Sequence, residues 1–140
     1  MPASVHLGFM KSTLLASSTT PSGLGADLGD GKGRTLTAGS WNAAIYDPLA
    51  AYVRPSDIHC AKNRQSGLWS PSQPLWTTLE EHKIGTILVT GVNTDQCVLG
   101  TLADAYNAGW NCVLVDDCCG TGTVGGRETV VHNVSVSAAM

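Results

Sequence analysis

The stretch TILVTGVNTDQCVLGTLADAYNAGW, residues 86–110, decides the fold expected for this chain of 140 residues. It opens with a continuous apolar run, Thr86–Thr90, of the kind that forms buried parallel strands, and we expect Gly91 to begin the turn out of it. A second run, Asn111–Val115, ends at the pair Asp116–Asp117. Two such runs joined by a helical segment predict neighbouring strands of a parallel α/β sheet. The acidic pair then falls at the carboxyl edge, where such sheets bind ligands.

The segment between the two runs is the clearest helix in the sequence, and we expect it to span residues 94–108. Thr94 is a good N-cap, Asp95 suits the positive end of the helix dipole, and Gly109 lies where a left-handed C-cap belongs. The expected apolar face of this helix consists of Val98, Leu102, Ala105 and Tyr106.

Further elements are expected on both sides of this unit. Ile58–Ala61 is a short candidate strand. Pro74 opens a helical stretch that runs through His82, because proline is favourable in the first turn of a helix. Arg127–Ala139 is the expected final helix, although its β-branched residues are poor helix formers.

The N-terminal part of the chain has a different texture. Residues 16–40 are rich in Gly, Ser and Thr and have neither helical nor strand periodicity, so they predict a long loop. The GxGxxxG spacing of the glycines there, without a preceding strand, argues against phosphate binding. We therefore expect a single domain over 1–140, with an irregular segment over 1–55 and an α/β core over 56–140.

Composition limits the classes of function. Apolar residues make up 43% of the chain and charged residues 14%, which suits a folded domain. The net charge of −3 and the lack of a basic cluster argue against nucleic acid as a partner. No apolar run approaches the roughly 18 residues that span a bilayer, and no leader-peptide pattern is present. We expect no membrane partner and a cytoplasmic location.

The five cysteines are an odd number without the spacing of a secreted disulfide framework, so we expect free thiols. The adjacent Cys118 and Cys119 leave a thiol-redox protein open as an alternative to an incidental structural role. His59 and His132 lack the paired spacing of zinc ligands. The sequence therefore predicts neither a metal nor a cofactor.

Cys97 is the residue best placed for chemistry. It lies in the first turn of the expected helix, where unpaired N–H groups and the helix dipole favour the thiolate form. The same N–H groups can stabilise an oxyanion formed when a thiolate attacks a carbonyl. From position alone, the alternative is a buried helical cysteine packed on the sheet.

At this segment the sequence resembles the isochorismatase-like cysteine hydrolase superfamily, which includes nicotinamidases and N-carbamoyl amidases. The family signature G-V-x-T-D-x-C-V is met by Gly91–Val98, the helix after it by Thr101–Ala105, and the next strand by Val113–Asp117. A second signature, a lysine ahead of R-x-S-x-F, is met by Lys62–Trp69, with leucine or tryptophan where phenylalanine is common. The resemblance implies a three-layer α/β/α fold with a parallel sheet.

The resemblance also implies site residues. Cys97 would be the nucleophile and Lys62 the cationic member of a catalytic triad. The Val92–Asn93 peptide bond would be cis, and the backbone N–H groups of Asn93 and Cys97 would face the oxyanion. An ammonium group near a thiol favours the thiolate, which agrees with this assignment, whereas Lys62 taken alone would be read as a surface lysine.

The third triad member, an aspartate at the end of the family's first strand, has no counterpart in residues 1–56. Asp27 and Asp30 lie in a glycine-rich loop, and Asp47 precedes a proline in a turn-like stretch. The family's first, second and sixth strands have no counterpart either. We therefore expect a family member truncated at both ends, with an incomplete sheet.

These residues predict a cysteine hydrolase that cleaves an amide or related C–N bond of a small molecule through a thioester, impaired by the missing aspartate. The alternative is an inactive fragment or pseudoenzyme that acts through association with another chain, because unpaired sheet edges recruit partners. A homo-oligomer is one form of that alternative. Trp41, Trp69 and Trp76 either line an apolar pocket or pack in the core.

Overall fold

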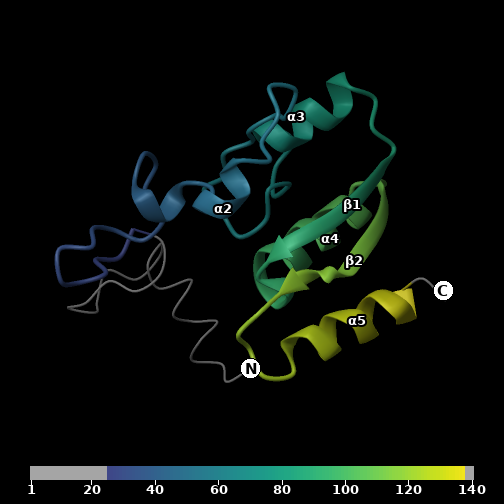
Figure 1. Ribbon diagram of the computed structural model, residues 1–140. Helices are drawn as coiled ribbons and strands as arrows, with labels where there is room; N and C mark the ends of the chain where they lie inside the picture. The colour runs from purple at the N-terminus through teal and green to yellow at the C-terminus, as the bar shows by residue number, and fades with distance from the viewer. Residues whose placement is uncertain (1–24, 138–140) are drawn as a thin grey trace. The chain divides into compact units, whose positions relative to one another are not determined.

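The computed structural model describes residues 25–137 of the chain (Figure 1). The chain divides into two compact units between Asp57 and Ile58. Residues 16–24 of the expected loop and residues 138–139 of the expected last helix lie outside the described part.

The first unit is irregular over most of its described length, as predicted. An isolated antiparallel bridge joins Asp27 to Arg34, and two short helices follow, η1 (Trp41–Ala43) and α2 (Asp47–Ala50). Within residues 25–57, Ala26 is the one buried side chain. This part of the chain therefore holds itself together by local hydrogen bonds and not by an apolar core.

The second unit contains the predicted parallel strands, β1 (Thr86–Val92) and β2 (Asn111–Gly120). Both run past the ends expected from the sequence, and Gly91 continues β1 with φ of 118° where a turn was predicted. That prediction was wrong because glycine adopts a positive φ inside a strand as readily as in a turn. The parallel α/β sheet itself is confirmed.

The two strands change register along their length. Val89 pairs with Leu114, but Gly91 pairs with Cys119. One residue of β1 therefore lies between these two pairs, whereas several residues of β2 do. Asp116 and Asp117 lie in this irregular part of β2 and not beyond its end. Irregularities of this kind re-aim side chains out of the ladder.

The predicted helix after β1 is present in two parts, η2 (Thr94–Val98), which is a turn of π-helix, and α4 (Leu99–Asn107). The N-cap is Asn93, and Thr94 is fully buried inside η2, so the assignment of Thr94 as the cap was wrong. Wider π-helical winding changes which residue starts the helix. The left-handed residue after the helix is confirmed, because Gly109 has φ of 98°.

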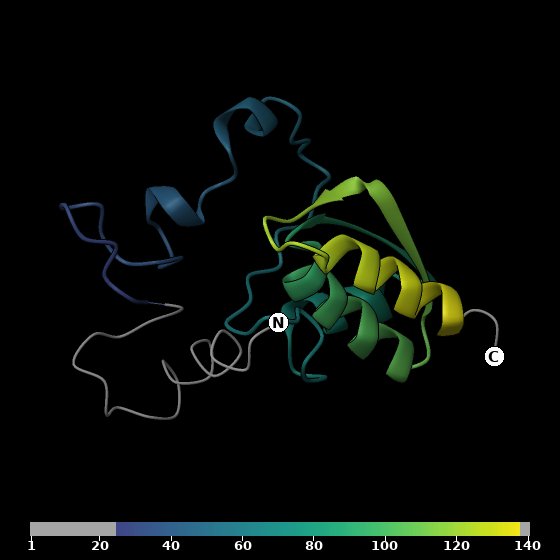
Figure 2. The same cartoon turned by 90° about the horizontal axis from the view of Figure 1, so that it is seen from below.

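Two further helices complete the second unit, α3 (Pro74–Glu81) and α5 (Gly126–Ser137), close to the predicted ranges. Figure 2 shows α4 and α5 side by side on one face of the β1–β2 sheet. Six buried apolar side chains form two clusters, one of Leu68, Leu79 and Ala105 and the other of Val89, Val98 and Leu102. Tyr106, expected on the apolar face of α4, is 57% exposed.

The candidate strand Ile58–Ala61 is absent, which corrects the prediction. These residues belong to no strand, and Ile58 is 55% exposed. A strand is stable only beside a hydrogen-bonded neighbour, and β1 and β2 are the two strands of the sheet within residues 25–137.

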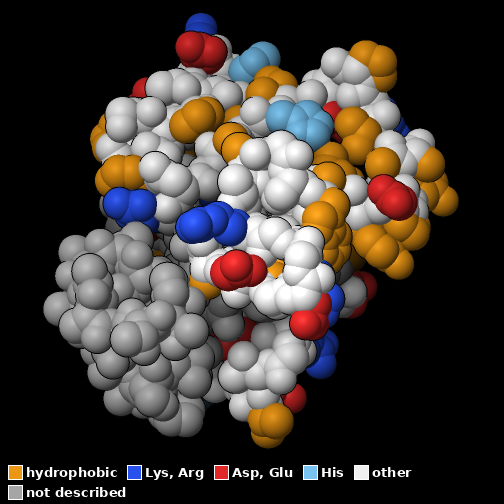
Figure 3. Space-filling model, turned by 90° about the vertical axis from the view of Figure 1, so that its left-hand side faces the viewer, with side chains coloured by type: hydrophobic (Ala, Val, Ile, Leu, Met, Phe, Trp, Pro, Cys, Tyr) orange, Lys and Arg blue, Asp and Glu red, His pale blue; other side chains and the backbone are white. Residues whose placement is uncertain are grey.

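The second face of the sheet is open in the described part of the chain. Leu88 of β1 is 65% exposed and Val113 of β2 is 47% exposed, although parallel sheets normally have both faces covered. On the molecular face in Figure 3, acidic and basic side chains are interspersed with apolar ones. Over residues 25–137 no helix has both the length and the apolar character needed to cross a membrane.

Candidate active site

Cys97 sits where a strand passes directly into a helix. β1 ends at Val92, and η2 begins after the single residue Asn93. The carbonyl oxygen of Asn93 accepts hydrogen bonds from the N–H groups of Gln96 (3.0 Å) and Val98 (3.2 Å), which fixes the first turn around Cys97. The Val92–Asn93 peptide bond is cis, as expected from the sequence. Cys97 itself is half-buried.

The structure brings Lys62 to Cys97. Lys62 Nζ lies 3.4 Å from Cys97 Sγ and also donates to the carbonyl oxygens of Arg64 (2.9 Å) and Gln65 (3.0 Å). An ammonium group has three N–H donors, so two are held by the backbone of its own loop and the third faces the sulfur. The structure therefore places the Lys62 ammonium group and the Cys97 sulfur in direct contact.

The loop that carries Lys62, residues 62–69, is called the Lys62 loop, and buried residues fix it. Leu68 is 1% exposed and belongs to the first core cluster, and Ser66 is also buried. Ser66 Oγ accepts a hydrogen bond from the Leu68 N–H (2.9 Å). Arg64 lies over the ring of Trp69 at 5.3 Å from the centroid, a cation–π contact on the exposed side of the loop.

Thr101 connects this loop to the helix that carries Cys97. Its hydroxyl donates to the carbonyl oxygen of Cys97 (2.8 Å) and accepts from the N–H of Gly67 (3.1 Å). Thr101 is not among the site residues expected from the sequence. Its position four residues after Cys97 is the signal for the first contact, whereas the contact with Gly67 cannot be read from the sequence.

Asp95 occupies the other side of η2 and contacts the segment before α5. Its Oδ1 accepts a hydrogen bond from Thr121 Oγ1 (2.6 Å), and its carboxylate lies against Gly126 at the start of α5. Burial raises the pKa of Asp95, but hydrogen bonds from Thr121 and Thr123 outweigh burial and hold this pKa below its ordinary value. Asp95 therefore attaches η2 to the turn that precedes α5.

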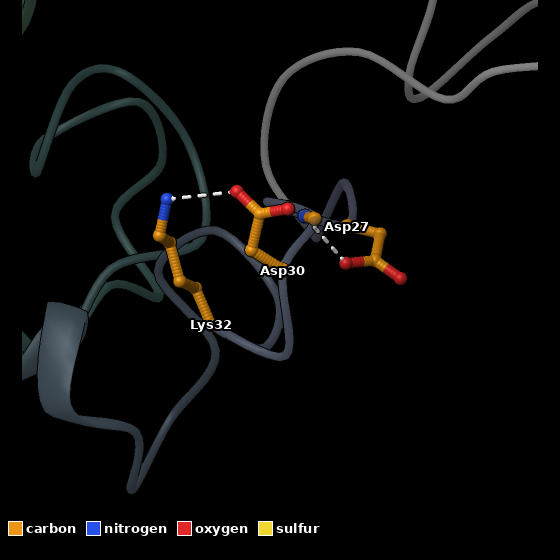
Figure 4. Close-up of polar contacts among 4 residues, drawn as sticks. Asp27, Asp30 and Lys32 are labelled. Atoms are coloured by element: carbon orange, nitrogen blue, oxygen red, sulfur yellow. Dashed lines mark hydrogen bonds and ion pairs between the residues drawn. The ribbon is translucent and has the colours of Figure 1, made fainter.

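Within residues 25–137, no carboxylate hydrogen-bonds to the Cys97 thiol. Figure 4 shows Asp27 and Asp30 in local contacts of the first unit: Asp27 Oδ1 accepts from the Gly29 N–H (2.9 Å), and Asp30 lies 3.2 Å from Lys32 Nζ. Asp47 is exposed at the start of α2. The described part of the chain also has no cluster of three or more His, Cys, Asp or Glu side chains suited to hold a metal ion.

The acidic pair at the sheet is occupied by a contact within the second unit. Arg127 of α5 makes a two-pronged ion pair with the carboxylate of Asp116, which raises the pKa of the Arg127 guanidinium. Asp117 is exposed. The Asp116 carboxylate therefore attaches α5 to β2, and we assign it no ligand.

The other residues that the sequence suggested as candidates have positions and contacts different from those of Cys97 and Lys62. Trp76 packs edge-on against Trp110 in the first core cluster, with ring centroids 4.9 Å apart. Trp41 is 69% exposed and Trp69 is 43% exposed, so neither is a core residue. All five cysteines are unpaired, including the adjacent Cys118 and Cys119.

A cavity of about 490 Å³ lies elsewhere, between α4 and α5. Its walls are mainly apolar and include Leu102, Tyr106 and Trp110, with Asn107 and Asn133 among the polar side chains. Neither Cys97 nor Lys62 lines it. It is thus a separate feature of the second unit.

The sequence of this chain is similar to known proteins. The family model described as "Isochorismatase domain" matches residues 10–140. The ureidoacrylate amidohydrolase RutB of Methylorubrum extorquens is 33% identical over 102 residues, which cover 72% of this chain and 40% of that protein. The chain thus spans about 40% of the length of curated relatives that it matches.

Solved structures share the fold. An isochorismatase-like hydrolase from Alkaliphilus metalliredigens superimposes with a TM-score of 0.63 at 26% identity, over 70% of this chain and 52% of that one. The nicotinamidase PncA from Bacillus subtilis superimposes with a TM-score of 0.64 at 23% identity, over 73% of this chain and 58% of that one. At that lower identity the similarity concerns the fold alone.

Proposed function

The chain belongs to the isochorismatase family, and on that premise we propose that it is a cysteine-nucleophile hydrolase of an amide or related C–N bond in a small molecule. One observation carries the proposal: Lys62 Nζ lies 3.4 Å from Cys97 Sγ at the start of a helix that follows a strand. The name of the 33% identical relative, an amidohydrolase, supports the bond type.

In the proposed reaction the Cys97 thiolate attacks the carbonyl carbon and forms a C–S bond. The backbone N–H groups of Asn93 and Cys97 donate hydrogen bonds to the oxyanion that forms. The C–N bond then breaks, and the nitrogen leaves as ammonia or an amine after it takes up a proton. Water hydrolyses the thioester, releases the carboxylic acid and returns the thiol. Lys62 holds positive charge beside the sulfur throughout.

The missing general base limits this reaction. No carboxylate of residues 25–137 hydrogen-bonds to the thiol, so that part of the chain holds no carboxylate base in place to take the thiol proton or to activate water in the second step. We propose that acylation of Cys97 outpaces hydrolysis of the thioester, and that the chain turns over slowly by itself.

The test uses the two compounds that the relatives' names supply, ureidoacrylate and nicotinamide. We expect mass spectrometry to find an acyl group on Cys97 together with slow ammonia release, and Cys97→Ala to abolish both. Cys118→Ala is the matched control because Cys118 is an exposed cysteine outside the site, and it should leave both signals unchanged. Ammonia release that survives Cys97→Ala would contradict the proposal.

A second candidate function is a catalytically inactive chain that acts through association with another chain. The exposed face of the sheet, with Leu88 and Val113 open to solvent, favours it. Sedimentation velocity distinguishes the two: this candidate requires a stable dimer or higher complex, and a cooperatively unfolding monomer would contradict it.

A further inference from the structure

We infer that Thr101 is a positioning residue, which fixes the Lys62 loop on α4 and thereby holds the ammonium group at the Cys97 sulfur. The inference rests on the proposed function only in that it assigns Cys97 as the nucleophile. The Thr101 hydroxyl bonds to the Cys97 carbonyl oxygen and not to Cys97 Sγ, and we assign Thr101 no step of the reaction.

The Thr101 hydroxyl takes part in two hydrogen bonds. The hydroxyl has one hydrogen, which goes to the carbonyl oxygen of Cys97, and its lone pair receives the N–H of Gly67. The side chain thus joins the backbone of the nucleophile to the backbone of the lysine loop, which are far apart in the sequence. Thr101 is half-buried, which limits competition from water.

The loop that carries Lys62 also approaches α4 closely. A Cβ atom at Gly100 would lie 3.6 Å from the backbone nitrogen of Ser66, so the loop backbone runs in contact with the helix at the residue before Thr101. A Cβ atom at Gly67 would lie 3.0 Å from Leu75 Cδ2 and 3.8 Å from Lys62 Cδ. Gly67 therefore lies against the aliphatic stem of Lys62, and its hydrogen bond to Thr101 of α4 helps to set where that stem runs.

The same loop holds the ammonium group of Lys62 in place. Lys62 Nζ is held by the carbonyl oxygens of Arg64 and Gln65, both in the same loop. If the loop shifts along α4, the ammonium group shifts with it and leaves the sulfur. The interaction of the charge with a thiolate weakens with distance and with the water that enters.

The competing explanation is that Thr101 makes only the back-bond common for threonine inside helices, in which its hydroxyl donates to the carbonyl four residues before. That accounts for the contact with Cys97. It does not account for the hydrogen bond from Gly67, which spans two segments. The two explanations differ in whether removal of the hydroxyl affects Cys97 through Lys62.

The experiment is a double-mutant cycle read by alkylation of Cys97 with iodoacetamide at pH 7, measured by mass spectrometry on the intact fold. The variants are T101V, which keeps the shape and removes the hydroxyl, T101S, which keeps the hydroxyl, K62M, and the double variant K62M/T101V. Cys118 in the same sample provides an internal reference rate.

We expect T101V to slow alkylation of Cys97 about three- to tenfold, the effect of one lost hydrogen bond, and T101S to restore it. In the K62M background, T101V should cause no further slowing. Overturning results are an unchanged rate in T101V, or equal slowing by T101V with and without Lys62. If T101V does not fold, as judged by circular dichroism, T101A takes its place in the same cycle.

This readout needs no substrate, so it separates the inference from the proposed function. A protein without any amide hydrolysis but with the expected cycle would contradict the proposed function and leave the role of Thr101 intact. Conversely, amide hydrolysis that depends on Cys97, together with an alkylation rate that T101V leaves unchanged, would support the proposed function and contradict the role of Thr101.

Discussion

Residues 25–57 and residues 58–137 have similar fractions of apolar residues but very different packing. The first region buries Ala26 alone and exposes most of its large apolar side chains, among them Trp41 at 69%, Tyr52 at 79% and Leu49 at 59%. The second region contains both core clusters and both members of the Cys97–Lys62 pair.

The difference shows what holds a catalytic geometry in place. Apolar residues stabilise a structure only where secondary structure aligns them on one face, and the first region has no helix or strand long enough to do so. In the second region Leu68 is inserted into the core a few residues after Lys62, and this insertion fixes the loop.

The largest effect is expected for a matched pair of leucine truncations. Leu68→Ala removes a side chain that is 1% exposed and should lower the free energy of unfolding by about 2–5 kcal/mol, because it leaves a cavity. Leu49→Ala, at a side chain that is 59% exposed, should change it by less than about 0.5 kcal/mol. Urea unfolding followed by circular dichroism measures both. Equal losses would mean that residues 25–57 are packed in solution.

A smaller effect is expected for glycines of the second region that differ in the space around them. Gly126→Ala should cost about 1–3 kcal/mol, because the new Cβ atom would lie 2.9 Å from Asp95 Cγ and 3.0 Å from Thr123 Cβ. Gly122→Ala is the control, since nothing lies within 4 Å of its Cβ position. The same unfolding measurement applies, and a harmless Gly126→Ala would refute the close contact between η2 and the start of α5.

The smallest effect is expected in the pH dependence of stability. Because the pKa of Asp95 is lowered in the folded protein, its carboxylate stabilises the fold above the unfolded-state pKa, roughly pH 4, and this contribution is lost as the pH falls through the lowered value. Asp95→Asn should flatten that part of the acid profile. Asp30→Asn, at a solvent-exposed ion pair of the first region, should leave it unchanged. Acid titration of the unfolding midpoint checks both, and identical profiles would contradict the role of Asp95.

The parts of the fold that were predictable are those set by local sequence. The strand–helix–strand unit around Cys97, the helix that begins at Pro74 and the left-handed Gly109 all follow from periodicity, proline placement and glycine conformation. Ile58–Ala61 was not predictable in this way, because strand formation depends on a neighbour that local sequence does not reveal.

The same limit applies to the site. The motif residues Cys97 and Lys62 could be selected from the sequence, and the structure places them in contact. The contact of Thr101 with Gly67 and the contacts of Asp95 with Thr121 and Gly126 depend on how distant segments pack. Likewise, the N-cap is Asn93 and not Thr94 because the first turn of the helix is π-helical. Helix propensities do not predict that kind of turn.

The most direct test of the central claim is a competition among the five free thiols for a limiting amount of iodoacetamide at pH 7. Exposure alone predicts that Cys118, the exposed cysteine, reacts first. Our account predicts that the half-buried Cys97 reacts first because of Lys62, and that K62M removes this preference. Faster labelling of Cys118 than of Cys97 in the unmodified chain would contradict the account.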